Sequence, residues 1–148
     1  MNNNENKTDR WSGVIMLEPM GKQRPRIVSR GRFSTAYTPK PTRDWTLSAQ
    51  KQIRKLWTGD PIPAGVPVAL KLVSVHKRPQ RLMRQKDPEE RLWKPTKCDI
   101  DNVAKIVMDS LNGLVWTDDA QVCELSVSQF YAAKGEESKV ELEVWRLT

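Results

Sequence analysis

The 148-residue sequence has few of the residue types that build disulfide frameworks or soft-metal sites. It contains two cysteines, Cys98 and Cys123, and one histidine, His76. Two cysteines without a metal-type spacing exclude a cysteine-rich zinc module and a disulfide scaffold, and they favour a reducing, cytoplasmic compartment. We expect Cys123 to be a small core residue rather than a nucleophile.

Long hydrophobic runs are also absent. No apolar stretch approaches 18 residues and no signal peptide is visible, so we expect neither a membrane span nor export. The chain is long enough for one domain with a substantial core. We expect this domain to occupy residues 11–148, after a polar, disordered tail over residues 1–10.

Acidic residues are scarce outside the last third of the chain. Residues 1–43 carry nine basic and three acidic side chains, residues 77–97 carry eight and three, and residues 98–148 carry four and ten. A basic region beside an acidic one is typical of a nuclease, in which one part grips phosphates and another holds a cation. A solubilising surface with segregated charge is the alternative.

The most informative stretch runs from Lys97 to Gln121, where four aspartates flank a short apolar segment. The spacing predicts a helix over residues 102–112, followed by a short strand at 114–116 and a turn at 117–119. One face of this helix would be apolar, formed by Val103, Ile106, Val107, Ser110 and Leu111. Its start can be capped by an aspartate, and Gly113 provides a left-handed end.

The four aspartates would meet if the chain around the helix returns to its starting point. An extended segment 99–101 directs two carboxylates to one side, and the strand after the helix would bring Asp118 and Asp119 to the same end. Carboxylates in one cleft require a cation, and hard oxygen ligands suit Mg²⁺, with Mn²⁺ as a possible substitute. Lys105, one turn after Asp101, would face the same cleft and stabilise charge on a phosphate. The pattern favours metal-assisted phosphodiester hydrolysis.

The order D-I-D-N-V-A-K, D-S-L-N-G and D-D-A-Q-V resembles the RusA family of Holliday-junction resolvases and its phage relatives. The earlier G-K-Q-R-P-R and Y-T-P-K-P-T-R resemble the opening segment of that family. The resemblance extends over roughly residues 13–144, and it is weak between Val66 and Trp93. Cys98 departs from it, because relatives commonly have proline before the first aspartate.

The resemblance implies a metal-dependent, structure-selective endodeoxyribonuclease that resolves four-way junctions by paired hydrolysis in recombination and repair. It also implies a homodimer, whose two-fold symmetry matches the substrate. The candidate catalytic residues are Asp99, Asp101, Lys105 and Asp119. The candidate metal ligands are Asp99, Asp101, Asp118 and Asp119, with Glu124 as a weaker candidate.

Two basic segments are the candidates for gripping DNA. One is a Gly/Pro-punctuated loop near the N-terminus, and the other is a long basic loop or partly helical insertion over residues 77–97. The candidate DNA-binding residues are Lys22, Arg24, Arg26, Arg30, Arg32, Arg81, Arg84 and Lys97. We expect Trp93 either to stack on a base or to pack on the domain, and His76 to be structural or to contact DNA rather than to bind metal.

The remaining periodicities complete an α+β fold. Residues 13–17 and 66–76 predict strands, and residues 39–57 contain a helix with an apolar stripe. Residues 122–131 and 139–145 predict an antiparallel hairpin. We expect a single α+β domain with a mixed sheet, two main helices and a C-terminal antiparallel hairpin.

Two functional alternatives stay open at this point. One is a non-catalytic protein that binds branched DNA, in which the aspartates are helix caps and solvated turns. The other is a nuclease for flaps or forks. A calcium-binding EF-hand loop is excluded, because Val103, Ala104 and Ser110 stand where an oxygen ligand, a glycine and a glutamate are required.

Overall fold

The computed structural model describes residues 10–148, which form a five-stranded mixed sheet and two main helices. The sheet has the order β1-β7-β4-β6-β5. Its strands are β1 (Trp11–Ile15), β7 (Lys139–Arg146), β4 (Val68–His76), β6 (Val122–Tyr131) and β5 (Leu92–Trp93). Only β4 and β6 are parallel, so the predicted α+β class with a mixed sheet is confirmed. The expected tail lies, apart from Arg10, outside the described residues.

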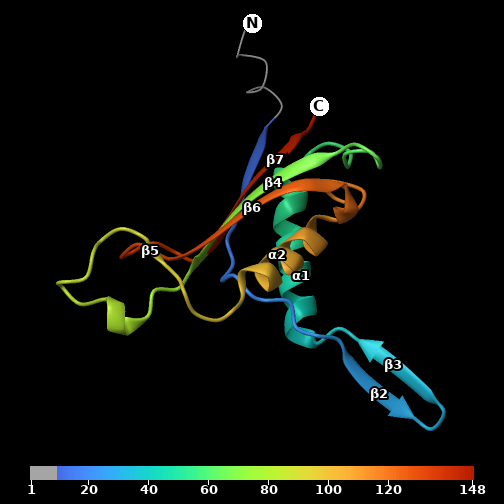
Figure 1. Cartoon of the computed structure of the whole chain (residues 1–148), viewed down its shortest axis with the longest axis horizontal. Helices are drawn as coiled ribbons and strands as arrows, with labels where there is room; N and C mark the ends of the chain where they lie inside the picture. Colours follow the sequence, from blue (N-terminus) through green and yellow to red (C-terminus); the bar gives the residue numbers. More distant parts are fainter. Residues whose placement is uncertain (1–9) are drawn as a thin grey trace, which may run out of the picture.

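Helices α1 (Lys40–Leu56) and α2 (Ile100–Leu111) cover one face of the sheet (Figure 1). All five residues of the predicted apolar face of α2 are buried. Helix α1 buries Trp45, Ala49 and Ile53 in the same core, and its Thr42 is also buried. None of the helices within residues 10–148 is long and apolar enough to cross a membrane.

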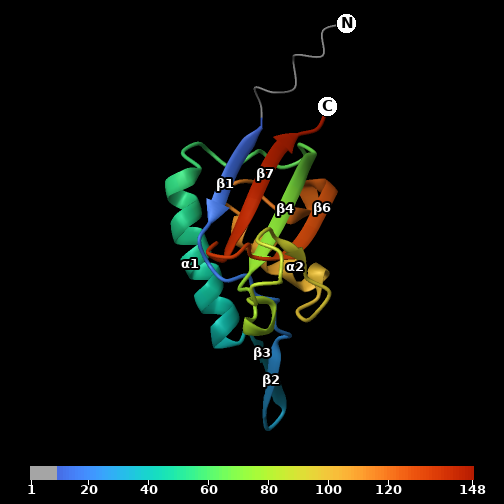
Figure 2. The same ribbon diagram turned by 90° about the vertical axis from the view of Figure 1, so that its left-hand side faces the viewer.

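Strand β4 lies at the centre of the sheet, and its position corrects the predicted hairpin. The two C-terminal strands run antiparallel, as expected, but they do not pair with each other, because β4 lies between β6 and β7 (Figure 2). Alternation identified β6 and β7 as strands but carried no information on their neighbours. Val140, Leu142 and Val144 of β7 face the helices, as predicted.

The first pairs of β4 with β6 contain an irregularity that overturns the expectation for Cys123. Val68 pairs with Val122, whereas the next residue, Ala69, pairs with Glu124, so Cys123 is an extra residue in the ladder. At this bulge Cys123 is exposed rather than part of the core.

The expected strand at residues 114–116 is also wrong. The chain turns back on itself there, because the backbone N–H of Gly113 donates to the Trp116 carbonyl at 2.7 Å. Gly113 has φ +75°, the left-handed conformation predicted for the end of α2. Val115 and Trp116 are fully buried, and Trp116 makes only isolated bridges to Ile62 and Asn112.

Residues 26–37 form a two-stranded antiparallel ribbon where the sequence suggested a loop. Its strands are β2 (Arg26–Arg30) and β3 (Phe33–Tyr37), joined by Gly31 and Arg32. In both views this ribbon projects away from the sheet and helices (Figures 1 and 2). Gly31 has φ +61°, which suits the first central position of a tight hairpin turn.

Residues 77–97, which we call the arm, form a partly helical insertion, the second of the two predicted alternatives, rather than a basic loop. They contain the short helix η1 (Gln80–Leu82) and strand β5. Arg78 is buried at the base of the arm and donates to the carbonyl oxygens of Leu82, Pro88 and Glu90 at 2.8, 2.6 and 3.0 Å. Thus Arg78, one of the eight basic residues of this segment, has a structural role inside the arm.

Candidate functional site

A cleft at the N-terminal end of α2 combines carboxylates with basic side chains. Its volume is about 520 Å³, and Asp99, Asp101, Lys105, Lys22 and Arg24 are among its lining residues. Asp99 is the residue before the helix, with extended backbone, whereas Asp101 is already in the first turn. The expected extended segment over residues 99–101 is therefore wrong, but both carboxylates and Lys105 do lie in one cleft.

The N-terminal basic segment is held against the start of α2 by a close backbone approach. A Cβ atom on Gly21 would lie 3.1 Å from Cys98 Cβ and 3.4 Å from Asn102 Cβ, so only glycine fits here without displacement. The next backbone N–H, of Lys22, donates to the Asn102 carbonyl at 3.0 Å. This contact places the root of the ribbon at the rim of the cleft.

The side chain of Lys22 extends along α2 and forms an ion pair with Asp109, with Nζ 2.6 Å from Oδ2. Asp109 was not among the residues singled out from the sequence. Its spacing from Asp101 and Lys105, at i+8 and i+4 on the same helix, was the signal that could have identified it. Because its ammonium is paired, Lys22 is less available to phosphates than the sequence suggested.

The other two predicted aspartates lie at the opposite end of α2. Burial raises the pKa of Asp119, the nearby Asn112 amide lowers it, and the negative charges of Asp118 and Asp109 raise it further. Asp119 begins the short helix η2 (Asp119–Gln121). The Gln121 side chain fixes this segment, because its Nε2 donates to the Pro63 carbonyl at 2.8 Å.

The expectation that all four aspartates meet at one end is therefore not met within one chain. Asp101 and Asp109 are eight residues apart on α2, a rise of about 12 Å, and Asp119 lies beside Asp109. Within residues 10–148, no three histidine, cysteine or carboxylate side chains are arranged to hold a metal ion. The candidate carboxylates form two groups, Asp99 with Asp101 and Asp109 with Asp118 and Asp119.

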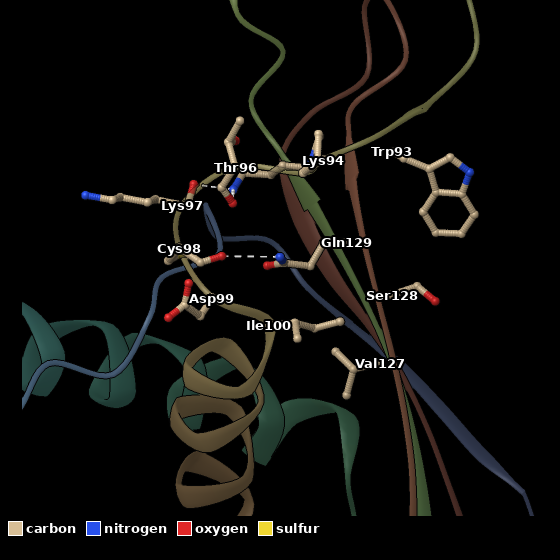
Figure 3. A pocket seen from close by; sticks show the side chains of 11 residues that line it. Trp93, Lys94, Thr96, Lys97, Cys98, Asp99, Ile100, Val127, Ser128 and Gln129 are labelled. Carbon is tan, nitrogen blue, oxygen red and sulfur yellow. Dashed lines mark hydrogen bonds between the residues drawn. The ribbon is translucent and has the colours of Figure 1, made fainter.

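A second, open cavity of about 840 Å³ borders Asp99 on the side of the arm (Figure 3). Gln129 of β6 is buried here, and its Nε2 donates to the Cys98 carbonyl at 3.2 Å. The Lys94 ammonium donates to the carbonyls of Thr96 and Lys97. These bonds fix the backbone immediately before Asp99, and the Lys97–Cys98 peptide bond is cis.

His76 and Trp93 are the last residues of β4 and β5, and both lie near this cavity. His76 ends β4, is 4% exposed, and its Nε2 lies 3.1 Å from Ser74 Oγ. Burial lowers its pKa, the positive charge of Lys94 acts in the same direction, and Glu18 opposes both. Of the two predicted roles, structural or in DNA contact, this buried position at the end of β4 fits the structural one. Trp93 stacks on Phe130, at 4.4 Å between ring centroids, yet remains 70% exposed.

The candidate DNA-binding residues differ in whether their side chains already have ion-pair or hydrogen-bond partners within the protein. Among residues 10–148, Arg24, Arg26, Arg30 and Arg32 form no ion pair, and all four are exposed. In the arm, Arg84 pairs with Asp87 at 3.3 Å, and Arg81 lies 3.4 Å from the Tyr131 hydroxyl. Lys97 borders the cavity beside Asp99, and Glu124 is exposed on β6.

Comparison with known proteins identifies the family to which this arrangement belongs. The chain is 38% identical over 81 residues to a Bacillus subtilis (strain 168) protein named "Uncharacterized protein YqaN". The match covers 51% of this chain and 55% of that protein, so the chain spans about half the length of this relative. A family model described as "Endodeoxyribonuclease RusA" matches residues 17–144, which is nearly the whole chain. The chain therefore belongs to the RusA family of endodeoxyribonucleases.

Proposed function

We propose that this protein is an Mg²⁺-dependent endodeoxyribonuclease that resolves four-way DNA junctions by paired phosphodiester hydrolysis, in recombination and repair. The observation that carries the proposal is the cleft at the start of α2. There Asp99, Asp101 and Lys105 lie together with Lys22 and Arg24, at the root of an exposed basic ribbon. Carboxylates for a cation beside cations for phosphates are the two requirements of hydrolytic DNA cleavage.

The donor set of the cleft suits Mg²⁺. Asp99 and Asp101 offer hard carboxylate oxygens and are exposed to water, and Asn102 adds an amide group to the lining. Mg²⁺ keeps several of its waters and is commonly bound by one or two carboxylates together with substrate phosphates. Two carboxylates from one chain are thus a sufficient protein contribution, and Mn²⁺ would fit the same oxygens. The bound ion supplies an activated water and neutralises charge at the scissile phosphate.

The other residues of the cleft bind and orient the DNA strand. Lys105 is exposed, one turn after Asp101, and its ammonium stabilises the charge that develops on the phosphate oxygens. The Lys22 ammonium is paired with Asp109 at 2.6 Å, so it contributes less to phosphate binding than an unpaired cation would. Arg24 has no ion-pair partner among the described residues and can contact a neighbouring phosphate.

A homodimer matches the proposed substrate, because a four-way junction has two-fold symmetry and needs two cuts. A dimer would also give a role to Asp118 and Asp119. These residues would join Asp99 and Asp101 of a partner if the two α2 helices pack antiparallel across the two-fold axis. Asp118 and Asp119 lie far from Asp99 and Asp101 of their own chain. In such a dimer they would lie close to Asp99 and Asp101 of the partner.

The proposal is tested with labelled DNA of equal arm sequence: a four-way junction, a flap, a fork and a linear duplex. Asp99→Asn and Asp101→Asn should each lower single-turnover cleavage of the junction by on the order of 10²–10³-fold, while junction binding is kept or tightened. Lys105→Ala should also slow cleavage far more than it weakens binding. Asp60→Asn, at an exposed aspartate outside the cleft, is the matched control.

Each alternative gives a different result in the same assay. Cleavage of flaps or forks in preference to the junction would replace the proposed substrate but keep the proposed chemistry. Tight junction binding without cleavage in Mg²⁺ or Mn²⁺ would identify a non-catalytic binding protein. Near wild-type cleavage by Asp99→Asn or Asp101→Asn would remove that residue from the site.

A further inference from the structure

Among the helices and strands of residues 10–148, only β2 and β3 have every residue exposed. Each of the ten strand residues is exposed, and the ribbon pairs with no strand of the main sheet. An isolated two-stranded ribbon is only marginally stable in water, since it buries almost no apolar surface. A partner that covers the ribbon would supply that missing surface.

The two faces of the ribbon differ in chemistry. The register pairs Arg26 with Tyr37 and Arg30 with Phe33, so these four side chains share one face. We call this the arginine–aromatic face. The opposite face carries only small or apolar side chains, namely Ile27, Ser29, Ser34 and Ala36. On the arginine–aromatic face, Val28, Arg30, Thr35 and Tyr37 line a shallow hollow of about 300 Å³.

The charge of the ribbon and its root selects an anionic partner. Residues 22–43 contain seven basic side chains and no acidic one. Such a stretch repels another copy of itself and attracts a polyanion. Since the root of the ribbon lies at the cleft of Asp99 and Asp101, a strand bound in the cleft can continue along the ribbon.

The exposed aromatic residues indicate which kind of polyanion the ribbon binds. Phe33 is 79% exposed and Tyr37 is 44% exposed, although contact with phosphates alone needs no aromatic ring. Exposed rings beside arginines are suited to stacking on nucleic-acid bases. In a continuous duplex the bases already stack on one another, so an open base face occurs where the duplex branches or ends.

We propose that the arginine–aromatic face of the ribbon recognises the branch of a DNA substrate, with Phe33 stacked on a base at the branch and Arg26 and Arg30 on the flanking phosphates. This inference rests on the proposed function, because it assigns to the ribbon the discrimination between branched and linear DNA. The ribbon acts in binding and takes no part in the hydrolysis.

The experiment compares Phe33→Ala with Ile27→Ala, which removes a similarly exposed apolar side chain (72% exposed) from the opposite face. Binding is measured in EDTA, so that strands stay intact, to a four-way junction with 2-aminopurine next to the branch and to a linear duplex of the same sequence. Phe33→Ala should weaken junction binding roughly tenfold and duplex binding less than twofold. It should also abolish the 2-aminopurine fluorescence change, whereas Ile27→Ala should leave all three readouts at wild-type values.

Three results would overturn the proposal. One is junction binding by Phe33→Ala equal to wild type, and another is an equal loss for junction and duplex. The third is a fall in the mass of the DNA-free protein, by sedimentation, on either substitution, which would show that the ribbon docks on a second copy. Binding is measured without Mg²⁺ and does not depend on cleavage. Failure of the proposed cleavage activity can therefore be distinguished from failure of this inference.

Discussion

The ribbon and the arm are both basic, yet the fold uses their cations in opposite ways. In the arm, Arg78 is buried among backbone carbonyls, and Arg91 is held by Glu136 and Glu141 at 2.6 and 2.8 Å. In the ribbon, Arg26 and Arg30 are exposed and form no ion pair within residues 10–148. Arginine is thus a structural residue in the arm, whereas in the ribbon it is exposed to solvent.

This difference means that the number of basic residues in a region is not the number of cations available to bind DNA. An arginine that replaces water around buried carbonyls is part of the fold, and its removal leaves those carbonyls without donors. An exposed, unpaired arginine contributes almost nothing to folding and retains its full attraction for phosphate. Substitutions in the two regions should therefore have separable effects.

The largest expected effect is on stability and comes from the arm. Arg78→Leu should lower the free energy of unfolding by about 3 kcal/mol, because at least three buried or half-buried carbonyls lose their donor. For a domain of this size that corresponds to a fall in Tm of roughly 10 °C. Arg32→Leu, in the turn of the ribbon, should melt within about 2 °C of wild type. Equal melting of the two variants would contradict the assignment of Arg78 to the core of the arm.

The next effect is on DNA affinity and comes from the ribbon. The double variant Arg26→Ala/Arg30→Ala should weaken junction binding roughly tenfold at moderate salt and lower the salt-dependence slope by about 2, since each phosphate contact contributes about 0.9. Its melting temperature should not change. Lys51→Ala/Arg54→Ala, on the outer surface of α1, removes the same charge elsewhere. A slope that falls equally in both double variants would mean that only net charge matters.

The sequence predicted what depends on short spacing. The apolar face of α2 follows from its period, and Asp101 and Lys105 share a cleft because they are one helical turn apart. The position of Asp119 depends instead on the path after the helix. There, burial of Trp116 and the close turn at Gly113 keep the chain at the far end of α2.

Features that depend on partners distant in sequence were not predictable from periodicity. Strands β6 and β7 were recognised, but their separation by β4 is a property of the whole sheet. The ribbon did leave a local signal, because Gly31-Arg32 separates two segments rich in β-branched and aromatic residues. The structural role of Arg78 left none, since nothing nearby distinguishes it from Arg81 or Arg84.

The smallest expected effect concerns the ion pairs at the base of the arm, and pH can be used to weaken them. The hydrogen bond from Arg91 lowers the pKa of Glu136 to about 2, against the opposing effect of burial, and the Ala133 N–H adds to the lowering. Because the pKa is lower in the folded protein than the ordinary value of 4.5, this carboxylate stabilises the fold above pH 4.5. That contribution is lost as the pH falls from 4.5 towards 2.

Glu136→Gln should therefore reduce the free energy of unfolding at pH 7 by about 1 kcal/mol, less than a charge-assisted bond usually contributes, because Glu141 still holds Arg91. The difference from wild type should shrink as urea unfolding is repeated between pH 4.5 and 2, because protonation removes the same charge from the wild-type protein. Glu137→Gln changes the exposed neighbouring residue and should show no such convergence. A difference that stays constant across this range would mean that Glu136 stabilises the turn by packing. The Arg91–Glu136 ion pair would then add nothing measurable to the stability of the fold, and Glu141 alone would hold Arg91.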